Sequence, residues 1–266
     1  MDKASLGGIF LALGGIIAGL LLEGGNLGQI LQPTAAMIVF GGTIGAVLVQ
    51  FPLPVILASG KGLARVFFER KVNIEGVIKE IVGYANKARK EGIISLDRDL
   101  ENITDPFLKK SLMLAIDGTE PQELKKMMEL ELENQAEHEE KIPQVFESAG
   151  GFSPTIGIIG AVLGLIQVMQ RLDNIEEVGK GIAVAFVATV YGVGAANLFF
   201  LPSAGKLKIR VREEQLIREM MLEGVISILE GLNPRMVETK LKGFLADRNE
   251  KAKASAKASV KEPVAS

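Results

Sequence analysis

Two long apolar segments without charge restrict the fold of this chain more than any other feature. They lie between Ser153 and Gln170 and between Gly181 and Pro202. Each holds about the ~20 apolar residues that an α-helix needs to cross a bilayer, and neither contains Asp, Glu, Lys or Arg. The sequence therefore predicts two membrane-spanning helices here.

Two further apolar segments lie near the N-terminus, from Leu6 to Leu22 and from Thr34 to Phe51. The charged stretch before the first segment is short for a signal peptide, so we expect a retained span. Lys and Arg residues follow the second and fourth segments, whereas the link between the first two segments and the Leu172–Gly179 link between the last two have none. Because cytoplasmic flanks carry the excess of Lys and Arg, we predict four spans with both termini in the cytoplasm.

The composition excludes several classes of protein. The 266 residues are 48% hydrophobic and 23% charged, which indicates membrane spans together with a sizeable aqueous part. A net charge of −2 argues against a nucleic-acid binder, and the absence of cysteine with a single histidine, His138, argues against a metal centre. No phosphate-binding loop or hydrolase nucleophile motif is present, so we expect neither an enzyme nor a cofactor.

Small residues recur at helical spacing in the last two apolar segments. They form one stripe on each predicted helix: Gly157, Gly160 and Gly164 on the third, and Ala185, Thr189, Gly192 and Ala196 on the fourth. Such stripes let helices approach closely in lipid, which makes them packing faces. Thr155 and Thr189 occupy or border the stripes and are candidates for an ion path, although a threonine can also bond to its own helix backbone.

Several blocks resemble the MotA/PomA family, the A subunits of the bacterial flagellar stator. The resemblance covers roughly residues 1 to 246 in the family's order. Its blocks are Pro154–Gly157, Gly160–Leu165, Ala185–Gly192, Ala88–Asp97 and Met221–Gly231. It implies an all-α membrane protein with four transmembrane helices and a large helical cytoplasmic domain, assembled as a homo-oligomeric ring in the bacterial inner membrane.

The resemblance also implies how such a protein works. Five A subunits are expected to surround two copies of a B subunit, whose single membrane helix carries an essential aspartate. None of the four apolar segments holds an ionisable group, which agrees with a carboxylate supplied by a partner. The passage of H⁺ or Na⁺ would turn the ring, which pushes the rotor protein FliG. The chain is then a mechanical energy converter.

Roles for individual residues follow from the same resemblance. Pro154 and Pro202 match the family's two prolines that couple ion passage to movement; a favourable helix start and a helix terminator are the purely structural interpretations. Candidate rotor contacts are the cations Arg89 and Lys90, which end one predicted helix, and the anions Asp97 and Asp99, which begin the next. Stabilisation of the helix dipoles is the alternative role for these charges. Asp97 stands where many relatives have glutamate.

We expect five parts along the chain. They are spans one and two (1–52), a cytoplasmic helical loop that contacts the rotor (53–152), spans three and four with the ion path (153–203), a cytoplasmic helix (204–246) and a disordered tail (247–266). Ser95 is expected to cap the helix that carries Asp97. The helix from Val55 to Arg70 suits either the membrane surface or packing around its neighbours.

Two alternative functions fit part of this pattern. The related ExbB/TolQ energisers of envelope processes also combine Thr-bearing apolar helices with an aspartate-bearing partner, but they characteristically have three spans and an outer N-terminus. A self-contained secondary transporter would show broken helices and polar groups of its own in mid-membrane. The four charge-free segments favour the stator.

Overall fold

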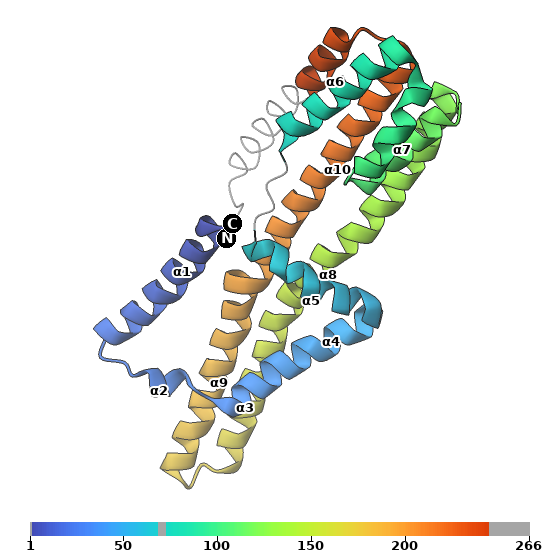
Figure 1. The fold of residues 1–266 in the computed structure, drawn as a ribbon. Helices are drawn as coiled ribbons and strands as arrows, with labels where there is room; N and C mark the ends of the chain where they lie inside the picture. Colours follow the sequence, from blue (N-terminus) through green and yellow to red (C-terminus); the bar gives the residue numbers. More distant parts are fainter. Residues whose placement is uncertain (1, 69–72, 245–266) are drawn as a thin grey trace, which may run out of the picture. The chain divides into compact units, whose positions relative to one another are not determined.

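The computed structural model describes residues 2–68 and 73–244, and its regular elements are all helical (Figure 1). Their bounds are α1 (Lys3–Leu22), α2 (Leu27–Ile30), α3 (Pro33–Ala36), η1 (Met37–Gly41), α4 (Gly42–Gln50), α5 (Leu53–Phe67), α6 (Ile74–Glu91), η2 (Ile93–Asn102), α7 (Pro106–Ile116), α8 (Pro121–Gln170), α9 (Ile175–Ala195), η3 (Ala196–Phe200) and α10 (Leu201–Leu229). A last helical stretch covers 234–244. The predicted tail at 247–266 lies outside the described residues.

In the part of the chain that the structure describes, four helices are long and apolar enough to cross a membrane, as the sequence predicted. Two are Ala4–Leu22 and Pro33–Gln50, and the other two lie within Pro121–Gln170 and Ile175–Leu229. The last two are parts of much longer helices, because α8 has 50 residues and α9 continues through the π-helical turn η3 into α10. The apolar spans therefore run on into charged helix without a break.

The chain forms two compact units. The first contains Met1–Arg70 and Glu137–Val211, and the second contains Lys71–Ala136 and Arg212–Ser266. The helix α5 and the neighbouring turns of α8 and α10 pack with the spans and belong to the first unit. The second unit begins only where α8 and α10 pack with α6 and α7.

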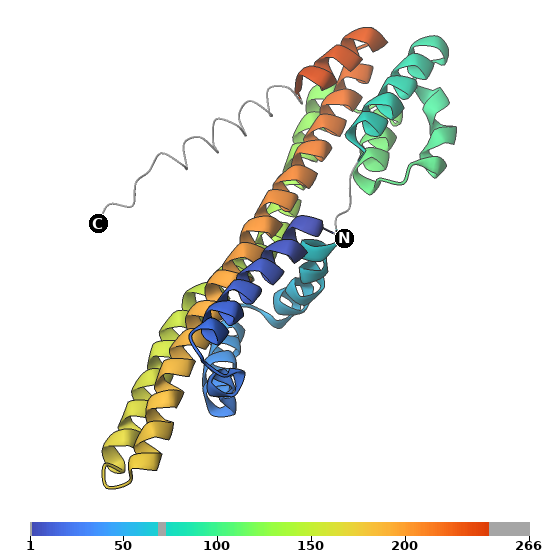
Figure 2. The ribbon, with the colours of Figure 1, turned by 90° about the vertical axis from the view of Figure 1, so that its left-hand side faces the viewer.

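In the first unit, α1 (dark blue in Figure 2) touches α2, α5 and η3, and its N-terminus forms a polar cluster. The Asp2 carboxylate accepts hydrogen bonds from the backbone N–H groups of Ala4 and Ser5, and it pairs with Lys206 and Arg210. The Asp2 N–H also donates to the Phe67 carbonyl oxygen at the end of α5. Beyond this cluster, α1 exposes most of its apolar side chains within a single chain.

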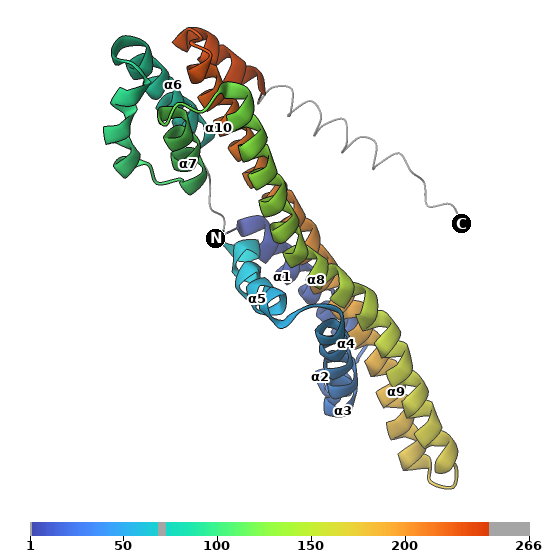
Figure 3. The ribbon, with the colours of Figure 1, turned by 90° about the vertical axis from the view of Figure 1, so that its right-hand side faces the viewer.

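The amphipathic helix α5 packs against its neighbours, which is one of its two predicted placements (Figure 3). Ser59, Gly62 and Val66 form its buried face. A β-carbon on Gly62 would lie 2.7 Å from Ile142 of α8, so the two helices are in close contact. Leu53 and Leu57 remain exposed on the opposite face.

The second unit has its own hydrophobic core. Its fully enclosed side chains include Ile81, Leu96, Leu112, Met128 and Met220. Gly92, with φ 83°, ends α6 in the left-handed backbone region that favours glycine. The prediction that Ser95 caps the next helix is wrong, since its hydroxyl donates to the Gly92 carbonyl oxygen at 2.6 Å inside a 3₁₀-helix, η2.

Candidate functional site

The third and fourth spans touch along glycines of α8 and small residues of α9. A β-carbon on Gly192 would lie 2.6 Å from the Ser153 carbonyl oxygen, and one on Gly164 would lie 2.8 Å from the Gly181 carbonyl oxygen. The corresponding distance from Gly157 to the Ala188 carbonyl oxygen is 2.9 Å. Real β-carbons do not approach backbone oxygens so closely, so these positions require glycine.

The Ser153 hydroxyl adds a polar link to this contact. It is buried and donates a hydrogen bond of 3.0 Å to the Gly192 carbonyl oxygen. Membrane helices associate through packing and such interhelical hydrogen bonds, because lipid gives no hydrophobic driving force between them. Close packing and this hydrogen bond therefore hold α8 and α9 together as a helical hairpin within the first unit.

The small residues of α9 that face α8 are not the same set that the sequence predicted. Gly181, Ala185, Ala188 and Gly192 are buried, and all four lie beside the glycines of α8. Thr189, placed in the stripe by the sequence pattern, is only half-buried, whereas Ala196 is buried in η3. The spacing 181, 185, 188, 192 is as regular as the predicted one, so the sequence contained a signal for the correct face.

The two threonines differ in exposure. Thr155 is exposed, about 200° around α8 from Gly157, so it does not border the glycine stripe. Its hydroxyl donates to the Phe152 carbonyl oxygen at 2.8 Å. The Thr189 hydroxyl donates to the Ala185 carbonyl oxygen at 3.2 Å. Both hydroxyls keep unused lone pairs that a passing cation or water could meet.

Both candidate coupling prolines lie inside continuous helix. Pro154 is an interior residue of α8, and Pro202 is the second residue of α10, directly after the π-helical turn η3. The interpretations of Pro154 as a helix start and of Pro202 as a helix terminator are therefore wrong. An interior proline removes one helical hydrogen bond and weakens the helix at that point, so each proline marks a deformable place on a long helix.

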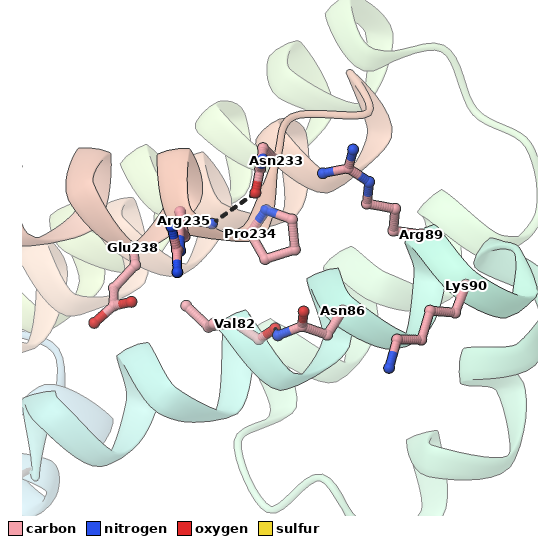
Figure 4. Close-up of a pocket in the computed structure, with 8 residues that line it drawn as sticks. All are labelled: Val82, Asn86, Arg89, Lys90, Asn233, Pro234, Arg235 and Glu238. Carbon is pink, nitrogen blue, oxygen red and sulfur yellow. Dashed lines mark hydrogen bonds between the residues drawn. The ribbon is translucent and has the colours of Figure 1, made fainter.

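The candidate rotor contacts lie in the second unit, and two of them line a cleft (Figure 4). Arg89 and Lys90 extend from the last turn of α6, and Arg235 lines the cleft from the helical stretch 234–244. The cleft has a volume of about 670 Å³. Its other lining residues are Val82, Asn86, Asn233, Pro234 and Glu238.

The cleft has a positive charge. Among the described residues, no carboxylate lies within ion-pair distance of Arg89, Lys90 or Arg235. The Glu238 carboxylate forms its ion pair with Lys242, at 2.6 Å, and this contact, with a smaller contribution from the charge of Arg235, lowers the pKa of Glu238. Sequence inspection missed Arg235, because it is far in the chain from Arg89 and only the packing of the second unit brings them together.

The two anionic candidates differ in environment. Asp99 forms an ion pair of 2.8 Å with Lys87 and is half-buried, whereas Asp97 is exposed. Both lie inside η2 and not at the beginning of a helix as predicted. The charge of Asp99 also acts on Tyr84, whose pKa is raised well above its usual range, mainly by burial and by a hydrogen bond to Glu80. Asp99 therefore has a partner inside the unit, and Asp97 is free to meet another protein.

In the ranges 2–68 and 73–244, no group of three or more Asp, Glu or His side chains is arranged to bind a metal ion.

Comparisons with known proteins agree on one family. The MotA/TolQ/ExbB proton channel family matches residues 99–220, and the N-terminal domain of motility protein A matches residues 6–92. Motility protein A of Bacillus subtilis (strain 168) is 37% identical over 92% of this chain and 91% of its own length. Chemotaxis protein PomA of Vibrio alginolyticus is 31% identical over 92% of this chain and 96% of its own.

Solved structures show the same similarity. A chain of the C. jejuni MotAB structure superposes with a TM-score of 0.87 at 32% identity, covering 92% of this chain and 96% of that chain. A chain of the flagellar MotAB stator complex from Bacillus subtilis gives 0.85 at 37% identity, covering 94% of this chain and all of that one.

Proposed function

Because this chain belongs to the motility protein A group of the MotA/TolQ/ExbB proton channel family, we propose that it is the A subunit of a flagellar stator. With a B subunit it forms an ion channel that converts an ion-motive force into torque. The match of residues 6–92 to the motility protein A domain covers the first two spans. This match favours the stator over an ExbB/TolQ-like energiser.

The observation that carries the proposal is the charge-free character of the four spans. They contain no Asp, Glu, Lys, Arg or His between Ala4 and Leu22, Pro33 and Phe51, Gly151 and Gln170, or Gly181 and Leu201. Ion-driven membrane machines need an ionisable group that takes up and releases the ion. We infer that the B subunit supplies it as an aspartate on a single membrane helix, and that the ion is H⁺ or Na⁺.

The exposed faces of the α8–α9 hairpin support a ring. Its glycine contacts are used up within one chain, yet Ile158, Val162, Phe186 and Val190 are each at least half exposed. These apolar side chains need lipid, a second copy or the B helix as neighbours. Five copies around two B subunits would place some of them at the contacts between copies and turn others, with Thr155 and Thr189, toward the B helices.

The expected location is the bacterial inner membrane, with both termini in the cytoplasm. Lys206, Lys208, Arg210 and Arg212 follow the fourth span, whereas the link after the third span carries only Arg171 and Lys180, together with Asp173, Glu176 and Glu177. Cytoplasmic flanks keep the excess of Lys and Arg. This orientation places the second unit in the cytoplasm, where the rotor is.

Torque would pass to FliG through the second unit. Arg89 and Lys90 at the positive cleft and Asp97 on η2 present unpaired charges of both signs, which suits a partner surface with complementary charges. Asp99 is expected to act mainly through its ion pair with Lys87. Pro154 and Pro202 would let the long helices α8 and α10 deform when the charge of the B aspartate changes.

Complementation of a cell that lacks its own stator tests the function. Expression of this chain with its B subunit is expected to restore motor rotation, and neither chain alone should do so. Swimming speed measured against Na⁺ concentration at fixed pH then identifies the ion. An assembled complex in the membrane that conducts no ion and turns no motor contradicts the proposal.

A further inference from the structure

The second span begins after a short extended link. Leu31, with φ −90° and ψ 89°, and Gln32, with φ −122° and ψ 98°, separate the end of α2 from Pro33 of α3. Gln32 makes no side-chain cap on α3. Extended residues make no helical hydrogen bonds, and backbone groups at the edge of a membrane need other partners.

A single side chain from the fourth span supplies these partners. The Tyr191 hydroxyl donates a hydrogen bond to the Ile30 carbonyl oxygen and accepts one of 3.3 Å from the Gln32 N–H. One phenol therefore holds the backbone on both sides of Leu31. Tyr191 is about 160 residues from this link in the chain, and α9 reaches it only because α3 lies against α9 (Figure 1).

The ring of Tyr191 is held in place as well. It lies 6.1 Å from the ring of Phe40, centroid to centroid, and packs on a cluster that includes Ala35, Val39 and Ala188. These three residues are fully buried. The packing aims the hydroxyl at the link, so the two hydrogen bonds do not depend on a freely rotating side chain.

Tyr191 also lies in the turn of α9 that carries the proposed ion-path threonine. Gly192 follows it and contacts α8 through Ser153, while Thr189 precedes it by two residues. Successive residues are about 100° apart around a helix, so Thr189 lies on nearly the opposite side of α9 from Tyr191. This turn is therefore held by the third span at one point and by the link to the second span at another.

We propose that Tyr191 is a positioning residue that fixes the rotation of α9 about its own axis and thereby the direction of the Thr189 hydroxyl. Without the Tyr191 hydroxyl, α9 keeps its glycine contacts with α8 but loses its two hydrogen bonds to the link before the second span. The consequence for transport rests on the proposed function, in which Thr189 faces the ion path. The positioning of α9 by these two hydrogen bonds does not depend on that function, because it follows from the contacts of Tyr191 alone.

The test uses the whole complex with a cysteine-free B subunit. This chain has no cysteine, so Thr189→Cys introduces its one thiol. The rate at which a small, water-soluble methanethiosulfonate reagent modifies that thiol is compared between the Tyr191 and Tyr191→Phe backgrounds. Tyr84→Phe is the matched control, since it removes a phenolic hydroxyl in the second unit and Tyr84 is the chain's other tyrosine.

We expect Tyr191→Phe to change the modification rate by about threefold or more, the size of effect that loss of one or two hydrogen bonds allows. The amount of assembled complex and the Tyr84→Phe rate should match the parent. Equal rates in both backgrounds overturn the positioning role and leave the ion path intact. A thiol that stays unmodified in both backgrounds overturns the ion-path assignment of Thr189 and the positioning role together. A Tyr191→Phe chain that no longer assembles shows that the hydroxyl serves only the fold, which also overturns the proposal.

Discussion

The buried Ser153 hydroxyl donates a hydrogen bond of 3.0 Å to the Gly192 carbonyl oxygen, which joins the third span to the fourth. Two features support this link. A β-carbon on Gly192 would lie 2.6 Å from the Ser153 carbonyl oxygen and 3.0 Å from the Gly157 Cα, both on α8, so the space for it is already filled. Hydrogen bonds between membrane helices contribute on average about 0.6 kcal/mol, so close packing supplies most of the stabilisation.

Replacement of Gly192 by alanine tests the packing directly. The new methyl group would lie 2.6 Å from the Ser153 carbonyl oxygen, so α8 and α9 must move apart. We expect a loss of about 1–3 kcal/mol in the stability of the complex, as in other overpacked contacts. The matched control is Gly194→Ala, because no heavy atom lies within 4 Å of a β-carbon there. Thermal unfolding in detergent should separate the two variants, and identical midpoints would show that the contact tolerates a methyl group.

The sequence predicted the four spans well because hydropathy and charge depend on composition alone. The face of each helix was harder to predict. The stripe with Ala185, Thr189 and Gly192 and the stripe with Ala185, Ala188 and Gly192 have equally regular spacing, and only packing against Gly157 and Gly160 selects the second. Periodicity finds a small-residue face, but it does not choose between two faces that lie a few tens of degrees apart.

Contacts between distant segments were not predictable from local patterns. Tyr191 looks like an ordinary apolar residue of a span, because its partners at Ile30 and Gln32 come from a different part of the chain. Arg235 was missed for the same reason. Pro154 and Pro202 were misjudged for a different reason. Local rules begin or end a helix at proline, whereas tertiary packing keeps α8 continuous through Pro154.

Asp97 and Asp99 should respond differently to substitution. Asp99→Asn removes the charge that pairs with Lys87, so we expect the second unit to lose about 0.5 kcal/mol of stability with little loss of motor rotation. Asp97→Lys is expected to leave the unfolding midpoint unchanged and to impair rotation, because Asp97 is exposed and has no partner in the described chain. Thermal unfolding and rotation of tethered cells measure the two effects. Equal loss of rotation in both variants would place Asp99 on the rotor-facing surface as well.

The positive cleft predicts a charge-dependent partner contact. Arg89→Glu and Arg235→Glu should each leave the protein folded and in the membrane while they slow rotation, since both side chains line the same cleft without an internal ion pair. Charge reversal on the rotor surface is expected to restore part of the speed, because complementary charges set the contact. Lys125→Glu is the control, as it changes the charge of an exposed residue outside the cleft. Normal rotation in Arg235→Glu would restrict the contact to α6.

Pro154→Ala should separate helix stability from torque. Alanine restores the helical hydrogen bond that the interior proline removes, so α8 is expected to become more stable, by up to about 3 kcal/mol. The stiffer helix should transmit less movement, which lowers rotation more than ion conductance. Pro143→Ala is the matched control, since Pro143 is also inside α8 but outside the apolar span. Unfolding, conductance and rotation are measured for both, and an equal loss of torque in Pro143→Ala would assign the effect to general stiffness.

Thr189→Val tests the ion path, because valine keeps the shape of threonine and deletes the hydroxyl. The variant loses only the hydrogen bond to the Ala185 carbonyl oxygen, at 3.2 Å, so the helix and the contact with α8 should remain. If the hydroxyl helps to coordinate the ion or to order water beside the B aspartate, conductance of the complex and rotation of the motor both fall. Thr155→Val is the companion change on the other helix, where the lost hydrogen bond ends at the Phe152 carbonyl oxygen. We expect the larger loss in Thr189→Val, since Thr189 is half-buried beside the α8 contact whereas Thr155 is exposed. Conductance and rotation equal to the parent in Thr189→Val would make that hydroxyl a packing group, bonded to its own helix, and would move the ion path to another face of the hairpin.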